Sequence, residues 1–567
     1  MSKNYPFWTY SGVAVKIRPY SLGKFLADEG FGNYKNSGER TEKGVLFRNR
    51  NGILETHSAD SIKKFVQTYV ENDEIHEYAD EDERVTFLDT WISKTANSIE
   101  TYLSSLPSFT EDGEGDSNAL KIFRDTKDEC YIPFKNGVVS ISKNKTELLP
   151  WEKIGKRGAV WETSIRDHVI ELPPEVGKST PVLSTARSKF SRGEMNAIDL
   201  LPESPFVNFI TYAFKHNVEP KEKGNKRDEG TESARYKQSV RGFETAFGYL
   251  IHRHNAPEDA KCVVFVDADS SQEKAEGGNG KSLSLESLKH IRNSETVDGK
   301  RFRKSAEDSS RFNFSNVTHA TEFILINDLN PDFDLTSIFS AITDDMEVEP
   351  KGRNKIVIPK EKKAKLALTT NYIITGVGGS YERRQHIVEF GNFFNKANKK
   401  RIQVPKIIGK PLFDSDFNAS DWNGFYLYAI ECVGRYLREG LRPAENANYK
   451  DRVVVTAVEG KGGSGEVTEW IRNWINVDRL EGGYDKSGIA VEDLFDLFER
   501  DYPMLANTKW SKPRLKRAIY EFVMATPELE YNPEQSGKGA GMNERRWLAG
   551  PKGEQKDAIK ITGKVSG

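Results

Sequence analysis

Cysteine is scarce in this chain. Its 567 residues include only Cys130, Cys262 and Cys432, which lie far apart in the sequence. This spacing excludes a local CxxC zinc knuckle and a disulfide framework. We therefore expect three reduced, structural cysteines.

Long hydrophobic runs are also lacking. The mean hydropathy is -0.64, and no run approaches the roughly 20 apolar residues of a membrane span. The opening residues, MSKNYPFWTYSGVAVK, lack the apolar core and cleavage site of a signal peptide. The sequence predicts a cytoplasmic protein that makes no membrane contact.

Charge of one sign is not in excess. The 83 Lys and Arg residues face 85 Asp and Glu residues, which gives a formal net charge of -2. A uniformly basic nucleic-acid coat is therefore excluded, and any such contact must come from local patches.

The length predicts several domains of about 150 residues each. Composition and periodicity predict a small α+β amino-terminal unit (1–105), a collar or connector region (106–217), a polar linker (218–240), an α/β core (241–410), a helical extension and linker (411–484), a winged-helix-like domain (485–550) and a flexible tail (551–567).

Two amino-terminal segments have recognisable periodicity. Ile62, Phe65, Val66 and Tyr69 fall on one face of a predicted helix in SADSIKKFVQTYVEN. The segment CYIPFKNGVVSISKNKTELLPW, near 130–150, predicts a hairpin of two short strands. Neither segment carries a catalytic pattern.

The strongest signal is a glycine-rich loop between a strand and a helix. The apolar run KCVVFVDAD predicts a central strand buried on both faces, and AEGGNGKSLSLESLKHI follows it. Small residues let backbone N–H groups surround phosphates, Lys281 can reach the β and γ oxygens, and Ser282 can hold Mg²⁺. Ala275 replaces the first glycine of this pattern, and SSQEKAE lengthens the gap after the strand. The predicted nucleotide-binding residues are Gly277, Gly278, Asn279, Gly280, Lys281, Ser282 and Leu283.

An acidic residue follows a second apolar strand. The run FILI ends at Asn327 and Asp328, where a carboxylate can bind Mg²⁺ or polarise the attacking water. Asp328 is the predicted catalytic acid and, with Ser282, the predicted Mg²⁺ ligand. Because Asn327 stands where a second acid is usual, Glu322 or Asp332 could also contribute.

Three further residues complete the predicted catalytic set. Asn371 closes the apolar run LALTT, where an amide can bind both the γ-phosphate and the water. Arg383 and Arg384 precede the strand-like HIVEF, and either guanidinium could reach the γ-phosphate of a neighbouring subunit.

Two basic patches predict DNA contacts. The stretch 351–365 has seven basic residues and one acid, and two short strands there would carry Lys351, Arg353 and Lys355 on a tip. The carboxy-terminal helix has an apolar face of Leu515, Ile519, Phe522 and Val523, and a Gly-rich hairpin follows it. This winged-helix pattern suits a DNA groove or a protein partner. Its predicted DNA-binding residues are Lys512, Arg514, Lys516 and Arg517.

The order of these motifs resembles superfamily-three helicases, closest to the poxvirus and phage primase-associated helicase group. The matching motifs are GGNGKS, FILINDL, ITDDMEVEPKGRNK, LALTTN and ERR. The resemblance covers about 240–400 and extends more weakly to PFKNGVVSI upstream and to the basic domain downstream. It implies an AAA+ P-loop fold, a hexameric ring and 3′ to 5′ movement along single-stranded DNA.

Our leading hypothesis is an ATP- and Mg²⁺-dependent DNA helicase or replication initiator of a phage or mobile element. It would act as a homo-oligomer on single-stranded and forked DNA in a bacterial host, with a separate primase or polymerase as a partner. The alternative is a DNA-binding loader or scaffold that uses ATP only to assemble. A fused primase is disfavoured, because residues 1–200 contain no convincing hxDxh-type acid pair with a partner histidine for two-metal polymerisation.

Overall fold

The computed structural model describes most of the chain. The described residues are 7–35, 44–72, 79–95, 99–111, 118–155, 158–173, 189–190, 192–215, 229–268, 277–302, 312–331, 333–350, 355–374, 379–395, 403–444, 447–460, 463–484, 488–526, 528–532, 546–549 and 555–563. They form two compact units, an amino-terminal unit of residues 1–173 and a carboxy-terminal unit of residues 174–567.

The amino-terminal unit is built on a six-stranded sheet of order β11-β5-β4-β3-β6-β7. A three-stranded antiparallel sheet, β10-β9-β8, and a hairpin, β1-β2, complete its strands. The strands are β1 (Trp8–Tyr10), β2 (Val15–Ile17), β3 (Phe31–Tyr34), β4 (Val45–Arg50), β5 (Ile53–Thr56), β6 (Ser108–Thr110), β7 (Asn118–Ala119), β8 (Glu129–Phe134), β9 (Gly137–Ser142), β10 (Thr146–Leu149) and β11 (Val160–Trp161). The helices are α1 (Pro19–Asp28), α2 (Ala59–Glu71), α3 (Glu81–Thr95), α4 (Ile99–Leu103) and α5 (Trp151–Ile154).

The expected helix near residue 62 is α2, and it buries the predicted face. Its first turn is capped by the Ser58 hydroxyl, which accepts from the backbone N–H of Ser61 at 3.1 Å. Ile62 and Val66 are fully buried in an aromatic-rich core, with Phe65 and Tyr69 packed against them. The apolar stripe therefore explains why this segment forms a helix that packs against the core.

Two expectations for this unit differ from the structure. The hairpin expected near 130–150 is a three-stranded meander, because TELL adds β10 to β9. The expected boundary at 105/106 falls inside one sheet, because β6 pairs with β3. These strands are short, and β3 and β6 lie far apart in the sequence. Hydrophobic periodicity therefore did not reveal which strands pair.

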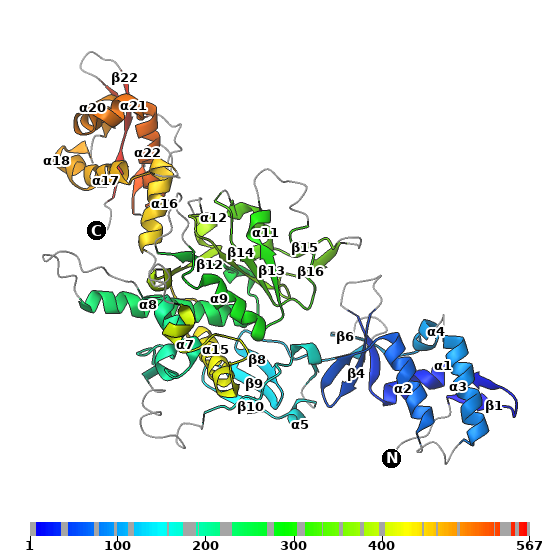
Figure 1. Ribbon diagram of the computed structural model, residues 1–567. Coiled ribbons are helices and arrows are strands. Elements are labelled where there is room, and N and C mark those ends of the chain that lie inside the picture. Colours follow the sequence, from blue (N-terminus) through cyan, green and yellow to red (C-terminus); the bar gives the residue numbers. More distant parts are fainter. Residues whose placement is uncertain are drawn as a thin grey trace. The chain divides into compact units, whose positions relative to one another are not determined.

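The carboxy-terminal unit contains a five-stranded sheet of order β13-β14-β17-β12-β18, and all of its strands are parallel (Figure 1). Its strands are β12 (Cys262–Asp267), β13 (Ser294–Asp298), β14 (Phe323–Asn327), β17 (Lys365–Thr369) and β18 (Gln385–Phe390), beside a hairpin of β15 (Met346–Val348) and β16 (Ile356–Ile358). The helices around it are α7 (Pro205–Ala213), α8 (Glu229–Ile251), α9 (Lys281–Glu286), α11 (Phe339–Thr343), α12 (Gly379–Glu382), α14 (Val404–Ile408) and α15 (Ala419–Glu439). The described part of the chain is thus a mixed α/β protein.

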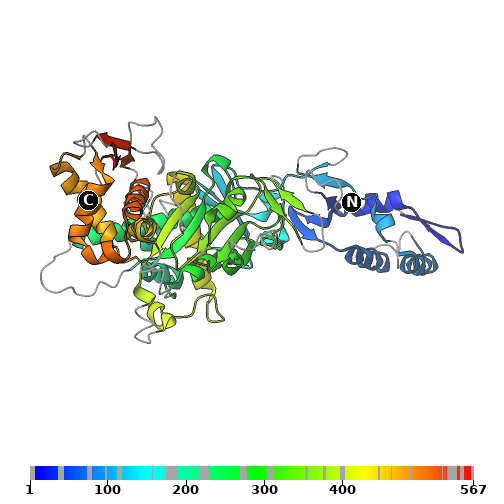
Figure 2. The same cartoon turned by 90° about the horizontal axis from the view of Figure 1, so that it is seen from above.

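The apolar run of β12 is buried on both faces of the sheet, as expected. Val264 and Val266 join the core that also contains residues of α11, whereas the ring of Phe265 packs in a tilted arrangement against Phe243 of α8 and Phe390 of β18, at centroid distances of 5.7 and 4.9 Å. Helices and loops therefore cover both faces, as a parallel sheet requires. Figure 2 shows the same structure after a 90° rotation about the horizontal axis.

The expected polar linker, 218–240, is helical from Glu229 onward. There α8 begins, and its residues become buried from Ser239. Residues 233–238 of α8 are mostly exposed, and composition alone does not separate such a solvated helix from a loop.

The remaining chain forms a small α/β domain with a three-stranded sheet, β19-β22-β21. It contains α16 (Ala447–Glu459), α17 (Glu466–Asn473), a π-helical turn (Trp474–Asp478), α18 (Arg479–Glu481), β19 (Ile489–Ala490), α20 (Val491–Asp501), α21 (Pro503–Thr508), α22 (Lys512–Met524), β20 (Glu530–Tyr531), β21 (Arg546–Ala549), β22 (Gln555–Ile559) and β23 (Ile561–Thr562). The predicted apolar face of α22 is confirmed, since Leu515, Ile519, Phe522 and Val523 are all buried.

The tail expected to be flexible is partly folded. Within 551–567, β22 pairs with β19 and β21, and β23 pairs with β20. Ala558 and Ile559 of β22 and Ile561 of β23 are buried in the domain core. Because the charged residues Lys556, Asp557 and Lys560 lie next to this short apolar run, the sequence showed no strand pattern here. Among the described residues, no helix is long and apolar enough to cross a membrane.

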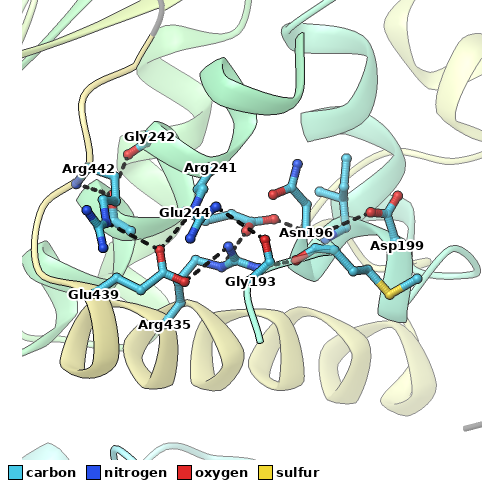
Figure 3. A network of polar contacts seen from close by, with 12 residues as sticks. Gly193, Asn196, Asp199, Arg241, Gly242, Glu244, Arg435, Glu439 and Arg442 are labelled. Atoms are coloured by element: carbon cyan, nitrogen blue, oxygen red, sulfur yellow. Dashed lines mark hydrogen bonds and ion pairs between the residues drawn. The ribbon is translucent and has the colours of Figure 1, made fainter. Parts of the chain in front are cut away.

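A buried ion-pair network joins α8 to α15 (Figure 3). Glu244 and Arg435 are both fully buried and lie 3.0 Å apart. Glu244 also accepts a hydrogen bond from the backbone N–H of Ile198 at 3.1 Å. Glu439 accepts a hydrogen bond from the guanidinium of Arg241 at 2.8 Å. Burial raises the pKa of Glu244 to about 7, although Arg435 opposes this shift.

This pKa makes stability depend on pH. The folded-state value lies above the ordinary 4.5, so the contribution is full below that value and is lost as pH rises through about 7. Glu244→Gln should remove the dependence, which is on the order of 3 kcal/mol. Thermal unfolding between pH values of about 4 and 8 would test this. Equal pH slopes for the variant and the wild type would contradict it.

Candidate active site

Three adjacent strands end at one edge of the parallel sheet. β14, β17 and β12 are neighbours in that order, so their carboxyl ends lie together. Asp267 ends β12, Asp328 follows β14, and Asn371 follows β17 by two residues. In open parallel sheets this edge is where ligands bind.

The loop residue Gly280 sets the start of α9. Its φ is +95°, a left-handed conformation that favours glycine, and it occupies the N-cap position. A Cβ at this position would lie 2.6 Å from Cζ of Phe209. The loop therefore needs glycine here for both conformation and space.

Lys281, in the first turn of α9, points into the strand ends. Its ammonium contacts Asp267 and lies 2.7 Å from Oδ1 of Asn371. The Lys281 side chain is 5% exposed and that of Asp267 is 2% exposed. Burial lowers the pKa of Lys281, and the carboxylate of Asp267 opposes that shift. The predicted phosphate-binding lysine and the predicted amide sensor are therefore in direct contact.

A second cluster of oxygens lies beside this lysine. The Ser282 hydroxyl donates to Oδ1 of Asn327 at 2.7 Å, and the Thr369 hydroxyl donates to the same atom at 2.6 Å. The Thr369 hydroxyl also accepts from the backbone N–H of Asp328 at 2.9 Å. Thr369 thus holds the end of β14 at the loop.

Asp328 adopts an unusual backbone conformation at this edge. Its φ is +60°, which few residues other than glycine adopt. Its carboxylate lies 3.0 Å from Nζ of Lys300, and this hydrogen bond raises the pKa of Lys300. A polar cavity of about 470 Å³ opens beside them, with Asp298 and Asn327 among its walls. The predicted acid therefore borders a space open to water.

The donor set fits Mg²⁺ that arrives with a phosphate ligand. The Ser282 hydroxyl, the Asn327 carbonyl oxygen and the Asp328 carboxylate supply oxygen ligands, which Mg²⁺ prefers. Among the described residues, no three His, Cys, Asp or Glu side chains cluster as a metal cage. A cation here would depend on phosphate oxygens and water as well.

The other predicted loop residues have different surroundings. A Cβ on Gly277 would lie 3.5 Å from Nδ2 of Asn371, and Gly278 has a φ of +107°. Asn279 is buried, and its Oδ1 accepts from the backbone N–H of Asn395 at 3.0 Å. Leu283 continues α9. Ala275 lies outside the described residues.

Arg383 and Arg384 lie at the opposite edge of the sheet, before β18. The carbonyl of Arg384 accepts from the N–H of Cys262, the first residue of β12. The Arg384 guanidinium covers the ring of Phe339 at 4.5 Å and donates to the carbonyl of Ser380. Arg383 is exposed. Neither arginine belongs to its own chain's strand-end cluster.

The predicted basic tip is partly described. β15 and β16 form the expected antiparallel pair, and Lys355 precedes β16 with its ammonium 2.5 Å from Glu347. Lys351 and Arg353 lie outside the described residues.

The four basic residues of α22 have different surroundings. Lys516 is 12% exposed and donates to both carboxylate oxygens of Asp557, so its contacts are structural. Lys512 pairs with an exposed glutamate, and Arg514 covers the ring of Trp510. Arg517 is 68% exposed. Lys512, Arg514 and Arg517 are therefore more accessible than Lys516.

Sequence reasoning missed two residues and left two others open. Asp267 and Thr369 were not singled out, although each ends an otherwise apolar strand. Glu322 stands at the amino end of β14, where it pairs with Arg253 at 2.6 Å, so it does not reach the strand-end cluster. Asp332 lies outside the described residues.

No family model matches this chain, and no curated protein matches it. Among solved structures, the A-form apo structure of the NrS-1 C-terminal region is similar to it, with 13% identity and a TM-score of 0.37, covering 96% of this chain and 99% of that one. A second structure, of that region's residues 305–718, has 10% identity and a TM-score of 0.38, covering 96% and 100%. Such low values assign no function.

The buried pair gives a stability prediction. Asp267→Ala leaves the Lys281 ammonium buried without its carboxylate and should cost about 3 kcal/mol. Asp267→Leu combined with Lys281→Met removes both charges and should recover most of that loss. Denaturant unfolding of the three proteins measures this. Wild-type stability in Asp267→Ala would show that the pair is not holding the loop.

Proposed function

We propose that this chain is an ATP-dependent DNA helicase or replication initiator of the superfamily-three type, encoded by a phage or similar mobile element. The convergence of Lys281, Ser282, Asp328 and Asn371 on one sheet edge carries the proposal. A loader or scaffold that binds ATP without unwinding DNA is the competing function.

The fold supports an AAA+ core for residues near 241–410. The glycine-rich loop follows β12, an internal strand of an all-parallel sheet, and opens α9. The acid follows β14, and the amide follows β17, which lies between β14 and β12. Lysine, metal ligands and sensor amide are thereby available to one triphosphate.

Each residue then has a chemical role with bound Mg-ATP. Lys281 donates to the β and γ oxygens and exchanges its contact with Asp267 for the phosphates. Ser282 and Asp328 would hold Mg²⁺, which would supply positive charge to the phosphates. Asn371 binds the γ-phosphate, and Asp328 orients the attacking water in the adjoining cavity.

Lys281→Ala tests this assignment. Loss of one preorganised donor should lower ATP hydrolysis at least about one hundredfold and abolish unwinding of a forked duplex. Lys289→Ala, which removes an exposed lysine from the turn after α9, is the matched control and should retain both activities.

Retained unwinding in Lys281→Ala would reject the mechanism. ATP-dependent oligomers of the wild type that leave the forked duplex intact would instead favour the loader.

A ring is proposed because the arginines lie away from their own chain's site. Arg384 is held by Phe339 and Ser380, so we assign the trans-acting role to exposed Arg383. An arginine supplied by a neighbour stabilises transition-state charge and makes hydrolysis depend on assembly.

Mixing subunits tests the assignment. Arg383→Ala alone should lose roughly a thousandfold in kcat. Mixed with Lys281→Ala subunits, it should regain part of the activity, because some interfaces then combine an intact lysine with an intact arginine. Steady-state ATP hydrolysis measures this. If Arg383→Ala is fully active while Arg384→Ala is not, the roles are reversed.

Proposed DNA contacts lie on two elements. The β15-β16 hairpin would present its basic tip, including Lys351, Arg353 and Lys355, to phosphates in a ring pore. A winged-helix role for the small domain is supported by its β19-β22-β21 sheet and by the exposed cations Lys512, Arg514 and Arg517 on α22. The proposed ligands are single-stranded and forked DNA.

A further inference from the structure

One helix, α16, belongs to two hydrophobic cores. Near its beginning, Tyr449 is 3% exposed in the core of the parallel sheet, and Val453 packs against the same core. Near its end, Val458 is 7% exposed in the core of the small domain, and Val454 packs there. The 13-residue helix is about 20 Å long, so it spans from one core to the other as a single element.

Side chains in the first half of α16 form hydrogen bonds with the backbone at the strand ends of the candidate site. The two terminal nitrogens of Arg452 donate to the carbonyls of Asp267 and Ala268, the latter being the last described residue before the glycine-rich loop. The Tyr449 hydroxyl accepts from the N–H of Ile374 at 3.2 Å, three residues after Asn371. A planar guanidinium that donates to two successive carbonyls fixes both position and direction of the backbone.

The last residue of α16 forms specific hydrogen bonds with the small domain. This residue, Glu459, accepts from the N–H of Gly465 at 3.0 Å and from the N–H and hydroxyl of Thr468 at 2.8 and 2.7 Å. These bonds cap the first turn of α17. From the first half of the same helix, Asp451 also pairs with Arg472 of α17 at 3.2 Å.

We propose that Arg452 is a positioning residue, and that α16 couples the state of the nucleotide site to the small carboxy-terminal domain. This inference rests on the proposed function, because it requires Lys281 to exchange Asp267 for a triphosphate. The change of partner alters the charge balance at the end of β12, where Arg452 holds the main chain. A packed helix shared by two cores transmits such a shift as a rigid body.

The coupling gives the small domain a mechanical role. Its exposed cations on α22 would change position with each nucleotide state, since α22 packs in the same core as Val458. The affinity of this domain for DNA would therefore depend on the bound nucleotide. By linkage, DNA bound to this domain would change the affinity for nucleotide by the same factor.

Hydrogen exchange of the full chain, with and without Mg²⁺ and a non-hydrolysable ATP analogue, tests the proposal. In the wild type, the analogue should alter amide exchange in α17 and α22 as well as in α9. In Arg452→Gln the change in α9 should remain at saturating analogue, and the change in α17 and α22 should be lost. Lys450→Gln, which removes an exposed cation from the same helix, is the matched control and should behave as the wild type.

Tyr449→Phe is the second variant, because it keeps the ring in place and removes only the acceptor for Ile374. It should reduce the distant response by at least half, while thermal unfolding stays a single transition with a modestly lower midpoint, because the buried N–H of Ile374 loses its acceptor. Wild-type protein that binds the analogue at α9 without any response in α17 or α22 would overturn the coupling and leave the nucleotide site intact. Protein that binds no analogue at all would overturn both proposals.

Discussion

A buried ammonium held between a carboxylate and an amide is the contact on which the candidate site depends. Lys281 is almost inaccessible to water, so its charge needs partners, and Asp267 and Asn371 supply them from two neighbouring strands. That requirement fixes the glycine-rich loop against the strand ends. The same arrangement leaves a cation ready to exchange one anionic partner for another.

The sheet and its surroundings follow from this placement. A parallel sheet buried on both faces brings β14, β17 and β12 to one edge, and the hydroxyl of Thr369 fixes the next strand end through Asn327 and Asp328. Helix α16 then connects that edge with the small domain through Arg452. The buried pair of Glu244 and Arg435 holds the helices behind the sheet.

The sequence predicted the core of this arrangement well. Continuous apolar strands and the glycine-rich turn predicted that Lys281, Asp328 and Asn371 lie at one sheet edge, because those signals are local, and their catalytic roles stay predictions. Asp267 was missed, since its role depends on a lysine that lies 14 residues later. The sheet of the amino-terminal unit and the strands after residue 555 could not be foreseen either. Their partners lie far away in sequence, and charged residues interrupt their alternation.

The most direct measurement is an experimental structure of the full chain with Mg²⁺, a non-hydrolysable ATP analogue and single-stranded DNA. We predict that Lys281 and Asn371 contact the γ-phosphate, that Mg²⁺ lies beside Ser282 and Asp328, and that an adjacent copy presents Arg383. A nucleotide bound elsewhere, with Lys281 still on Asp267, would contradict the account.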